Sequence, residues 1–323
     1  MTTRHNPRYL AICAIFRDEA RYLEEWLHFH LAVGVEHFFL YDNHSSDGPE
    51  TVLAPFVDAG LVTHISWPIP FHERAQSRAY ADCLERTRGL NRWVAFIDID
   101  EFLFSPTAMP LPAVLHRFEP FPGVVAHWQV YGSNGHEEMT DEPVIERFTR
   151  RAPTGWVRNR KVKSIVDPAR AVRPICPHHF SYRDGELAVD ETGRRIDFRR
   201  KSRYAKSIKR LYGCLGSFGP LFPIDPYKGA DVGRPGVMVA LLRVNHYPVK
   251  SREEFLFKAR FKKERRRYDD VDYFAYHDRN EIDDPILVGY FERLQALNLD
   301  DDMTPGLTRP THSRKPLLAG AAS

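Results

Sequence analysis

The sequence predicts an α/β fold with a mostly parallel central sheet. Three observations lead to this prediction. Apolar runs of strand length alternate with segments of helical periodicity, polar and acidic clusters follow three of these runs, and 323 residues are enough to bury a full core. The composition, 43% hydrophobic and 28% charged, is ordinary for a soluble globular protein.

Strands and helices alternate in the first hundred residues. Apolar runs predict strands at 9–16, 37–41, 61–67 and 93–98. Helical spacing of apolar residues predicts helices at 18–33, 50–58 and 73–88. Gly34 and Gly60 end the first two helices, because glycine readily takes the left-handed conformation that follows a helix. Strands joined by helices of this length form parallel β-α-β units.

The rest of the chain gives less regular signals. The predicted elements are a helix at 111–118, a strand at 124–131, a strand and an irregular loop within 156–182, a strand at 237–244, a helix that begins near Ser251, and an amphipathic helix at 284–297. Residues 303–323 are rich in Pro, Thr, Ala and Gly and predict a disordered tail.

Charge and cysteine content bear on partners and location. The net charge of +3 gives no argument for nucleic acid, and the basic tracts at 194–210 and 258–267 lack the aromatic pattern of RNA-binding motifs. We expect the second tract to be a solvated helix face, or else to contact anionic lipid. The four cysteines form no C-x-x-C pair, and no run of about 18 apolar residues occurs. With a polar N-terminus, these features predict a cytoplasmic protein.

The segment Arg92–Phe104 ends its apolar run in three carboxylates. Asp98, Asp100 and Glu101 lie within four positions. Because an unpaired carboxylate is unstable in an apolar interior, we expect the three acids at the exposed carboxyl end of a buried strand. There they would suit a hard divalent cation and the phosphate oxygens of a substrate. A turn that only closes an edge strand is the alternative explanation.

Two further polar clusters follow predicted strands. Arg17–Glu19 follows the first strand, and Asp42–Asp47 follows the second. The carboxyl ends of parallel strands meet at one edge of a sheet, so the three clusters converge there and predict a binding site. Asp18 or Asp47, taken alone, is as well explained as a helix cap.

An ordered set of short motifs resembles the family 92 glycosyltransferases and their bacterial relatives, which are close to family 2. The motifs are Ile15-Phe16-Arg17-Asp18-Glu19, Glu25-Trp26, Gly34-Val35, Tyr41-Asp42-Asn43-x-Ser45-x-Asp47, Gln76-x-x-x-Tyr80-x-x-Cys83, Trp93-x-x-x-Ile97-Asp98-x-Asp100-Glu101-Phe102-Leu103, Tyr131-Gly132-Ser133-Asn134-Gly135-His136 and Asn245-His246-Tyr247-x-x-Lys250-Ser251-x-Glu253-Glu254-Phe255. The resemblance covers roughly residues 9–291.

The resemblance implies a GT-A fold and a metal-dependent transfer. One domain would span 1–302, with a nucleotide-binding half at 9–130 and an acceptor-side half at 131–302. The implied donor is a nucleotide sugar, taken as a UDP-sugar, with Mn²⁺ or Mg²⁺ on its diphosphate. The implied acceptor is a glycan or a lipid-linked sugar, and the anomeric carbon would be inverted.

The resemblance also implies the residues of the site. The implied metal ligands are Asp98, Asp100 and His246. The implied nucleotide-sugar contacts are Arg17, Glu19, Asp42, Asn43, Gln76, Asp98 and Lys250. Asn43 departs from the family 2 pattern, in which many enzymes have a second aspartate that contacts the base.

The loop after the strand at 124–131 carries the candidates for a general base. Its two glycines allow a close approach of the backbone to a sugar. Glu137, Glu138 and Asp141 follow, where an inverting enzyme of this fold keeps the base that takes the proton of the acceptor hydroxyl. We favour Glu138, with Glu137 as the second candidate. Surface acids on a solvated loop are the alternative.

The histidines fall into two groups. His246 follows an apolar run and precedes Lys250 by four residues, which resembles the histidine that closes a GT-A metal site next to a diphosphate-binding lysine. A buried core histidine is the alternative. His178 and His179 lack the spacing of a structural zinc site, so we expect ordinary loop histidines.

The sequence therefore predicts a metal-dependent glycosyltransferase. A catalytically inactive nucleotide-sugar or glycan-binding protein of the same fold is the alternative. The presence of Asp98, Asp100 and His246 argues against it, because a binding module needs no metal triad. The identity of the sugar, the linkage and the oligomeric state are left open.

Overall fold

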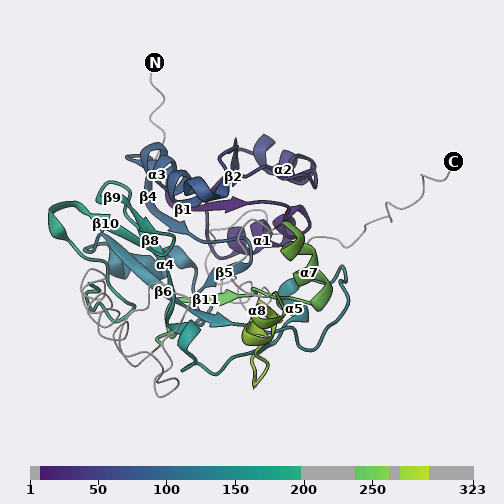
Figure 1. Ribbon diagram of the computed structural model, residues 1–323. Coiled ribbons are helices and arrows are strands. Elements are labelled where there is room, and N and C mark those ends of the chain that lie inside the picture. The colour runs from purple at the N-terminus through teal and green to yellow at the C-terminus, as the bar shows by residue number, and fades with distance from the viewer. Residues whose placement is uncertain (1–7, 198–236, 262–269, 291–323) are drawn as a thin grey trace, which may run out of the picture.

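The computed structural model describes residues 8–197, 237–261 and 270–290 (Figure 1). The strands of the central sheet are β1 (Arg8–Phe16), β2 (His37–Asp42), β3 (Val62–Ser66), β4 (Asn91–Phe96), β5 (Glu101–Phe104), β6 (Gly123–Val130), β8 (Val162–Val166) and β11 (Arg243–His246). The helices are α1 (Ala20–Ala32), α2 (Pro49–Asp58), α3 (Ala75–Thr87), α4 (Leu111–Leu115), α5 (Val144–Arg147), α7 (Arg252–Phe261) and α8 (Asp270–His277). No helix in these described parts is both long and apolar enough to span a bilayer.

The eight strands of the sheet lie in the order β3-β2-β1-β4-β8-β6-β11-β5. Parallel pairings join β1 to β2, β2 to β3, β1 to β4 and β6 to β11. Antiparallel pairings join β4 to β8, β6 to β8 and β5 to β11. The predicted α/β class is confirmed, with a parallel N-terminal half and a mixed second half.

The sheet is covered on both faces, which is why its strands read as continuous apolar runs. Alternate residues of a strand point to opposite faces. In β1, Leu10 and Ile12 therefore pack in one core with α1 and α4, whereas Ala11 and Cys13 pack in the other with α3. The strands predicted in the first hundred residues are confirmed within one or two residues.

The region at 156–182 differs from the prediction of one strand and a loop. It contains a 3₁₀ helix (Val157–Arg160), β8, and a hairpin of β9 (Ala171–Cys176) with β10 (His179–Tyr182). Strand β8 inserts antiparallel between β4 and β6. A lysine, Lys163, is the second residue of β8 and is 1% exposed. A charged residue is not expected in a buried strand. Lys163 can be buried there only because a partner elsewhere in the fold pairs with its charge.

The C-terminal part differs as well. Strand β11 begins at Arg243 and is shorter than the strand predicted at 237–244. Helix α8 is not predicted from the sequence, and the helix predicted at 284–297 begins later, because residues 284–285 are irregular, 286–289 form a turn and Tyr290 is helical. The rest of that helix, the tail at 303–323, Cys214 and most of both basic tracts lie outside the described residues.

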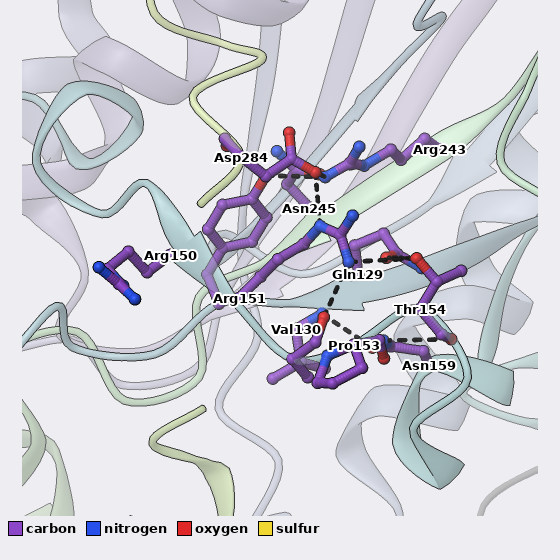
Figure 2. A network of polar contacts seen from close by, with 12 residues as sticks. Gln129, Val130, Arg150, Arg151, Pro153, Thr154, Asn159, Arg243, Asn245 and Asp284 are labelled. Carbon is purple, nitrogen blue, oxygen red and sulfur yellow. Dashed lines mark hydrogen bonds and ion pairs between the residues drawn. The ribbon is translucent and has the colours of Figure 1, made fainter. Parts of the chain in front are cut away.

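A polar network fastens the segment at 150–160 and Asp284 to the sheet (Figure 2). Asp284 forms ion pairs with Arg151 and with Arg243, the second at 2.9 Å. Asn159 accepts a hydrogen bond from the backbone N–H of Val130 in β6 at 2.9 Å. Short strands β7 (Arg150–Arg151) and β12 (Ile282–Asp283) pair next to Asp284. The 150–160 segment is thus held on β6 and β11, beside the carboxyl end of the sheet.

Candidate active site

Asp98 and Asp100 lie between β4 and β5, and Glu101 is the first residue of β5. The turn between these strands is closed by the backbone N–H of Glu101, which donates to the carbonyl of Asp98 at 3.1 Å. In return, the N–H of Asp98 donates to Oε2 of Glu101 at 2.8 Å. Glu101 is fully buried, which corrects the expectation that all three carboxylates are exposed. It can be buried because an internal cation lies against it.

That cation is Lys163 of β8. Its Nζ is 3.0 Å from Oε2 of Glu101 and 2.7 Å from Oδ2 of Asp98. The other oxygen of Asp98 accepts a hydrogen bond from the amide of Gln76, on α3, at 2.9 Å. Although burial opposes it, Asp98 and Glu101 together raise the pKa of Lys163 above its ordinary value. Asp98 and Gln76, two predicted nucleotide-sugar contacts, are therefore directly bonded to each other.

Asp100 has a different set of partners. Its Oδ2 is 2.9 Å from Nζ of Lys258, on α7, and its Oδ1 is 3.7 Å from Nε2 of His246, at the end of β11. The Asp100 side chain is 13% exposed, so this carboxylate too is less exposed than predicted. Nζ of Lys258 also lies 2.6 Å from Oε1 of Glu19. Residues from the first strand end, the acidic turn and the C-terminal part of the chain thus meet at one point.

The charges and the burial around Asp100 keep its carboxylate ionised and the imidazole of His246 neutral. Burial alone would raise the pKa of Asp100, but the ammonium of Lys258 in particular holds it well below its usual range. Burial alone would lower the pKa of Lys258, and Asp100 and Glu19 raise it instead. Burial lowers the pKa of His246 well below its usual value. A neutral imidazole is the form that can bind a metal.

Asp100 and His246 fit a divalent cation. Their facing atoms are 3.7 Å apart, which is too long for a hydrogen bond and can be spanned by an ion with ligand distances of about 2.1 Å. Within the described residues no three His, Cys, Asp or Glu side chains form a metal-binding group, and Asp98 is paired with Lys163. Two protein ligands suffice where phosphate oxygens complete the shell. The metal role of Asp98 stays a prediction.

The N-terminal polar clusters lie next to each other, as predicted. The N–H of Ala20 donates to Oδ2 of Asp47 at 2.7 Å, and the N–H of Ser46 donates to Oδ1 of Asp18 at 2.7 Å. Both acids thus tie the two loops together, whereas the N-cap residues of α1 and α2 are Glu19 and Gly48, so the capping alternative is wrong. Asp42 is buried, with Oδ2 3.7 Å from Nε2 of His64.

Three predicted nucleotide contacts have distinct surroundings. Asn43 donates from its amide to the carbonyls of Trp67 and Ile69, at 2.8 Å each, and so shapes the loop after β3. The Arg17 side chain is 46% exposed at the same edge. Lys250 is buried, with Nζ 4.1 Å from the centre of the Tyr22 ring, and burial lowers its pKa. Its contact with a diphosphate stays a prediction.

The loop of the candidate bases is held by α7 and by the segment after α8. The carbonyl of Glu137 accepts a hydrogen bond from the N–H of Glu253 at 2.9 Å. A Cβ on Gly132 would lie 2.4 Å from Oδ1 of Asn280, so only glycine fits there. The side chains of Glu137 and Glu138 are exposed. The loop therefore approaches the site through α7, the helix that carries Lys258.

The sequence interpretation misses the two lysines of the site. It places Lys163 in a segment without a role, and Lys258 in a solvated or lipid-facing helix face. The structure corrects the expected placement of Lys258, because this side chain is turned towards Glu19 and Asp100. The sequence contains only weak signals for these two roles. Lys163 lies within an apolar strand, and Lys258 lies one helix turn after the Ser251–Glu254 motif.

The comparison with known families decides the identity of the domain. The family model of glycosyltransferase family 92 matches residues 8–193, more than half of the chain. The chain belongs to glycosyltransferase family 92. The fold class predicted from the sequence, α/β of the GT-A type, is confirmed. The match to family 92 includes Asp98, Asp100 and Lys163, and it ends before His246, Lys250 and Lys258.

Individual relatives carry the same family name. A family 92 protein of Ricinus communis is 33% identical over 187 residues, which cover 55% of this chain and 32% of that protein. A family 92 protein of Oryza sativa subsp. japonica is 32% identical over 196 residues, which cover 58% of this chain and 32% of that protein. The matched part thus spans about a third of the length of these relatives. Among solved structures, S. aureus TarS 1–349 in complex with UDP aligns with a TM-score of 0.33 and 12% identity, over 50% of this chain and 47% of that chain.

Proposed function

We propose that this family 92 chain transfers a sugar from a UDP-sugar to a glycan or a lipid-linked acceptor. We further propose that the transfer depends on Mn²⁺ or Mg²⁺ and inverts the anomeric carbon. The observation that carries the proposal is the pairing of Asp100 with a neutral His246 at the carboxyl end of β4. Ligands of open α/β sheets bind at that end.

The residues of the site suit a diphosphate leaving group. Asp100 and His246 would hold the cation, which would stabilise the negative charge that develops on the diphosphate as the glycosidic bond breaks. Lys250 and Lys258 add two positive charges next to Asp100. Asp98 is held in one orientation by Lys163 and Gln76, so it can accept a hydrogen bond from the donor without rearrangement.

The acceptor would be activated from the loop that follows β6. Glu138, or next to it Glu137, would take the proton of the acceptor hydroxyl as that oxygen attacks the anomeric carbon. Both side chains are solvent-exposed, so neither must give up buried partners to reach an acceptor. The contacts of this loop with α7 support its assignment to the site, since Glu253 and Glu137 are hydrogen-bonded through their backbones.

Thermal stabilisation by nucleotide sugars tests the proposal directly. Unfolding is followed with a panel of UDP- and GDP-sugars, each with and without Mn²⁺. A ligand at 100 times its Kd adds about 2.7 kcal/mol to the free energy of unfolding, so specific binding is easily detected. We expect metal-dependent stabilisation by a UDP-sugar that is lost in Asp100→Ala. No stabilisation by any member of the panel would contradict the proposal.

A catalytically inactive binding protein would give a different result. It would bind the same donor but would release neither UDP nor a glycosylated product when acceptors are supplied. Measuring UDP release with the donor that stabilises the protein therefore separates the two functions.

A further inference from the structure

The two aspartates of the D-x-D motif are each paired with an internal lysine. Lys163 lies 2.7 Å from Asp98, and Lys258 lies 2.9 Å from Asp100. The two lysines differ in their surroundings. The side chain of Lys163 is 1% exposed and also neutralises the fully buried Glu101. The side chain of Lys258 is 26% exposed and stands on a helix near the surface.

Only one of these ion pairs can open at small cost. Removing Lys163 from Asp98 would require a shift in the buried strand β8 and would weaken the neutralisation of Glu101, whose carboxylate has no access to water. Lys258 has a second carboxylate, Glu19, at 2.6 Å. It can therefore leave Asp100 and still keep an ion pair.

From this difference we infer that Lys258 occupies the cation position beside Asp100 in the metal-free protein and leaves it when a divalent cation binds. The inference rests on the proposed metal dependence and adds the residue that controls entry of the ion. The ammonium of Lys258 and a divalent cation would compete for the same carboxylate, because two positive charges at one oxygen pair repel each other strongly in a partly buried site.

The charge balance of the site supports this exchange. The carboxylates of Glu19 and Asp100 are matched by the ammonium groups of Lys250 and Lys258, so the site is balanced without a metal. A divalent ion would add two charges at once. Movement of Lys258 from Asp100 to Glu19 lowers the repulsion between its ammonium and the ion, and a diphosphate bound to the same ion would offset the added charge.

The anchoring of α7 limits how the exchange can happen. The first turn of the helix is fixed by a reciprocal capping pair, in which the N–H of Ser251 donates to Glu254 at 3.0 Å and the N–H of Glu254 donates to Ser251 at 3.2 Å. Glu254 is also bound to Arg147 at 2.7 Å, and both side chains are almost fully buried. Movement is therefore expected in the part of α7 beyond this first turn, which includes Lys258.

Metal binding to a charge-removing variant tests the inference. The Kd of Mn²⁺ is measured by calorimetry for the full chain with and without UDP, for wild type and for Lys258→Met. We expect at least tenfold tighter Mn²⁺ binding by Lys258→Met without UDP. The matched control is Arg252→Gln, which removes one positive charge from the same helix. Arg252 lies over the ring of Phe274 at 4.6 Å, and this variant should bind Mn²⁺ like wild type.

The outcomes separate this inference from the proposed function. If wild type binds Mn²⁺ and folded Lys258→Met binds it no more tightly, Lys258 is a structural partner of Asp100 and the inference is wrong. If wild type does not bind Mn²⁺ with or without UDP, the proposed metal dependence fails and the inference fails with it. Equal tightening in Arg252→Gln would assign the effect to net charge and overturn the role of Lys258.

Hydrogen exchange on the wild-type protein covers the case in which Lys258→Met does not fold. Addition of Mn²⁺ and UDP should speed amide exchange in Phe255–Phe261, the part of α7 beyond its first turn, because the tie to Asp100 is released. The amide of Glu254, within the capped first turn, should be unaffected. Unchanged or slower exchange in Phe255–Phe261 under saturating Mn²⁺ would refute the exchange of ions.

Discussion

Removing the ammonium of Lys163 should lower the free energy of unfolding by about 3 kcal/mol, because breaking a buried ion pair from one side typically costs about 3 to 5 kcal/mol. Lys163 is 1% exposed and lies 3.0 Å from Glu101, which is fully buried. Burial already raises the pKa of Glu101 well above its usual value. In Lys163→Met we expect this carboxyl to take up a proton, which keeps the loss near the lower end of the range.

Urea unfolding with linear extrapolation measures this loss, provided that the slope m is unchanged. The matched control is Lys161→Met, which removes the same charge two residues earlier. Lys161 is partly buried with Nζ 5.2 Å from the centre of the Trp128 ring, so this variant should lose no more than about 1 kcal/mol. Adding Glu101→Gln to Lys163→Met should restore part of the stability, because the glutamine side chain is neutral without taking up a proton. Equal losses in the two single variants would refute the reasoning.

Three further outcomes are expected. His246→Ala should raise the Mn²⁺ concentration at which activity is half-maximal. An unchanged midpoint would show that His246 is not a metal ligand. Glu138→Gln should lower kcat by a factor on the order of 10² to 10⁴ without changing UDP affinity, whereas Glu137→Gln should change little; the reverse result would assign the base to Glu137. Burial would raise the pKa of Asp284, but Arg243 and Arg151 lower it, so its stabilising contribution is present above the unfolded-state pKa and is lost as pH falls through the lower folded-state pKa. Unfolding measured from pH 5 downwards should therefore lose stability less steeply in Asp284→Asn than in wild type, and parallel curves would contradict this.

The parallel half of the sheet follows from the sequence because its signals are local. The apolar runs of β1 to β4 are buried on both faces, and the helices between them have regular apolar spacing. The elements whose sequence signals are weak break those local rules. β5 begins with a charged residue, Glu101, and β8 carries Lys163 as its second residue. Each of these charges can be buried only because the other lies next to it. Their pairing is a tertiary contact, so the local sequence does not reveal it.

The acids of the site are visible in the sequence, and their counter-ions are not. Asp98 and Asp100 stand out because charge follows an apolar strand. Lys163 is 65 residues from Asp98, and Lys258 is 158 residues from Asp100. No spacing rule links residues so far apart, and a lysine on a helix usually belongs to a solvated face. The residue types predict that a cation binds these acids, whereas only the fold reveals that two ammonium groups are there already.

This distinction changes how the D-x-D motif is expected to work. In the sequence it is a concentration of negative charge, whose affinity for a metal would depend on the acids alone. In the structure each aspartate is paired with an ammonium group, one that is also held by Glu101 and one that can move to Glu19. A divalent ion alone would leave this site with excess positive charge, and a diphosphate alone would meet the carboxylates. The two together restore the balance, so metal and nucleotide should bind cooperatively, which the Mn²⁺ titrations with and without UDP measure.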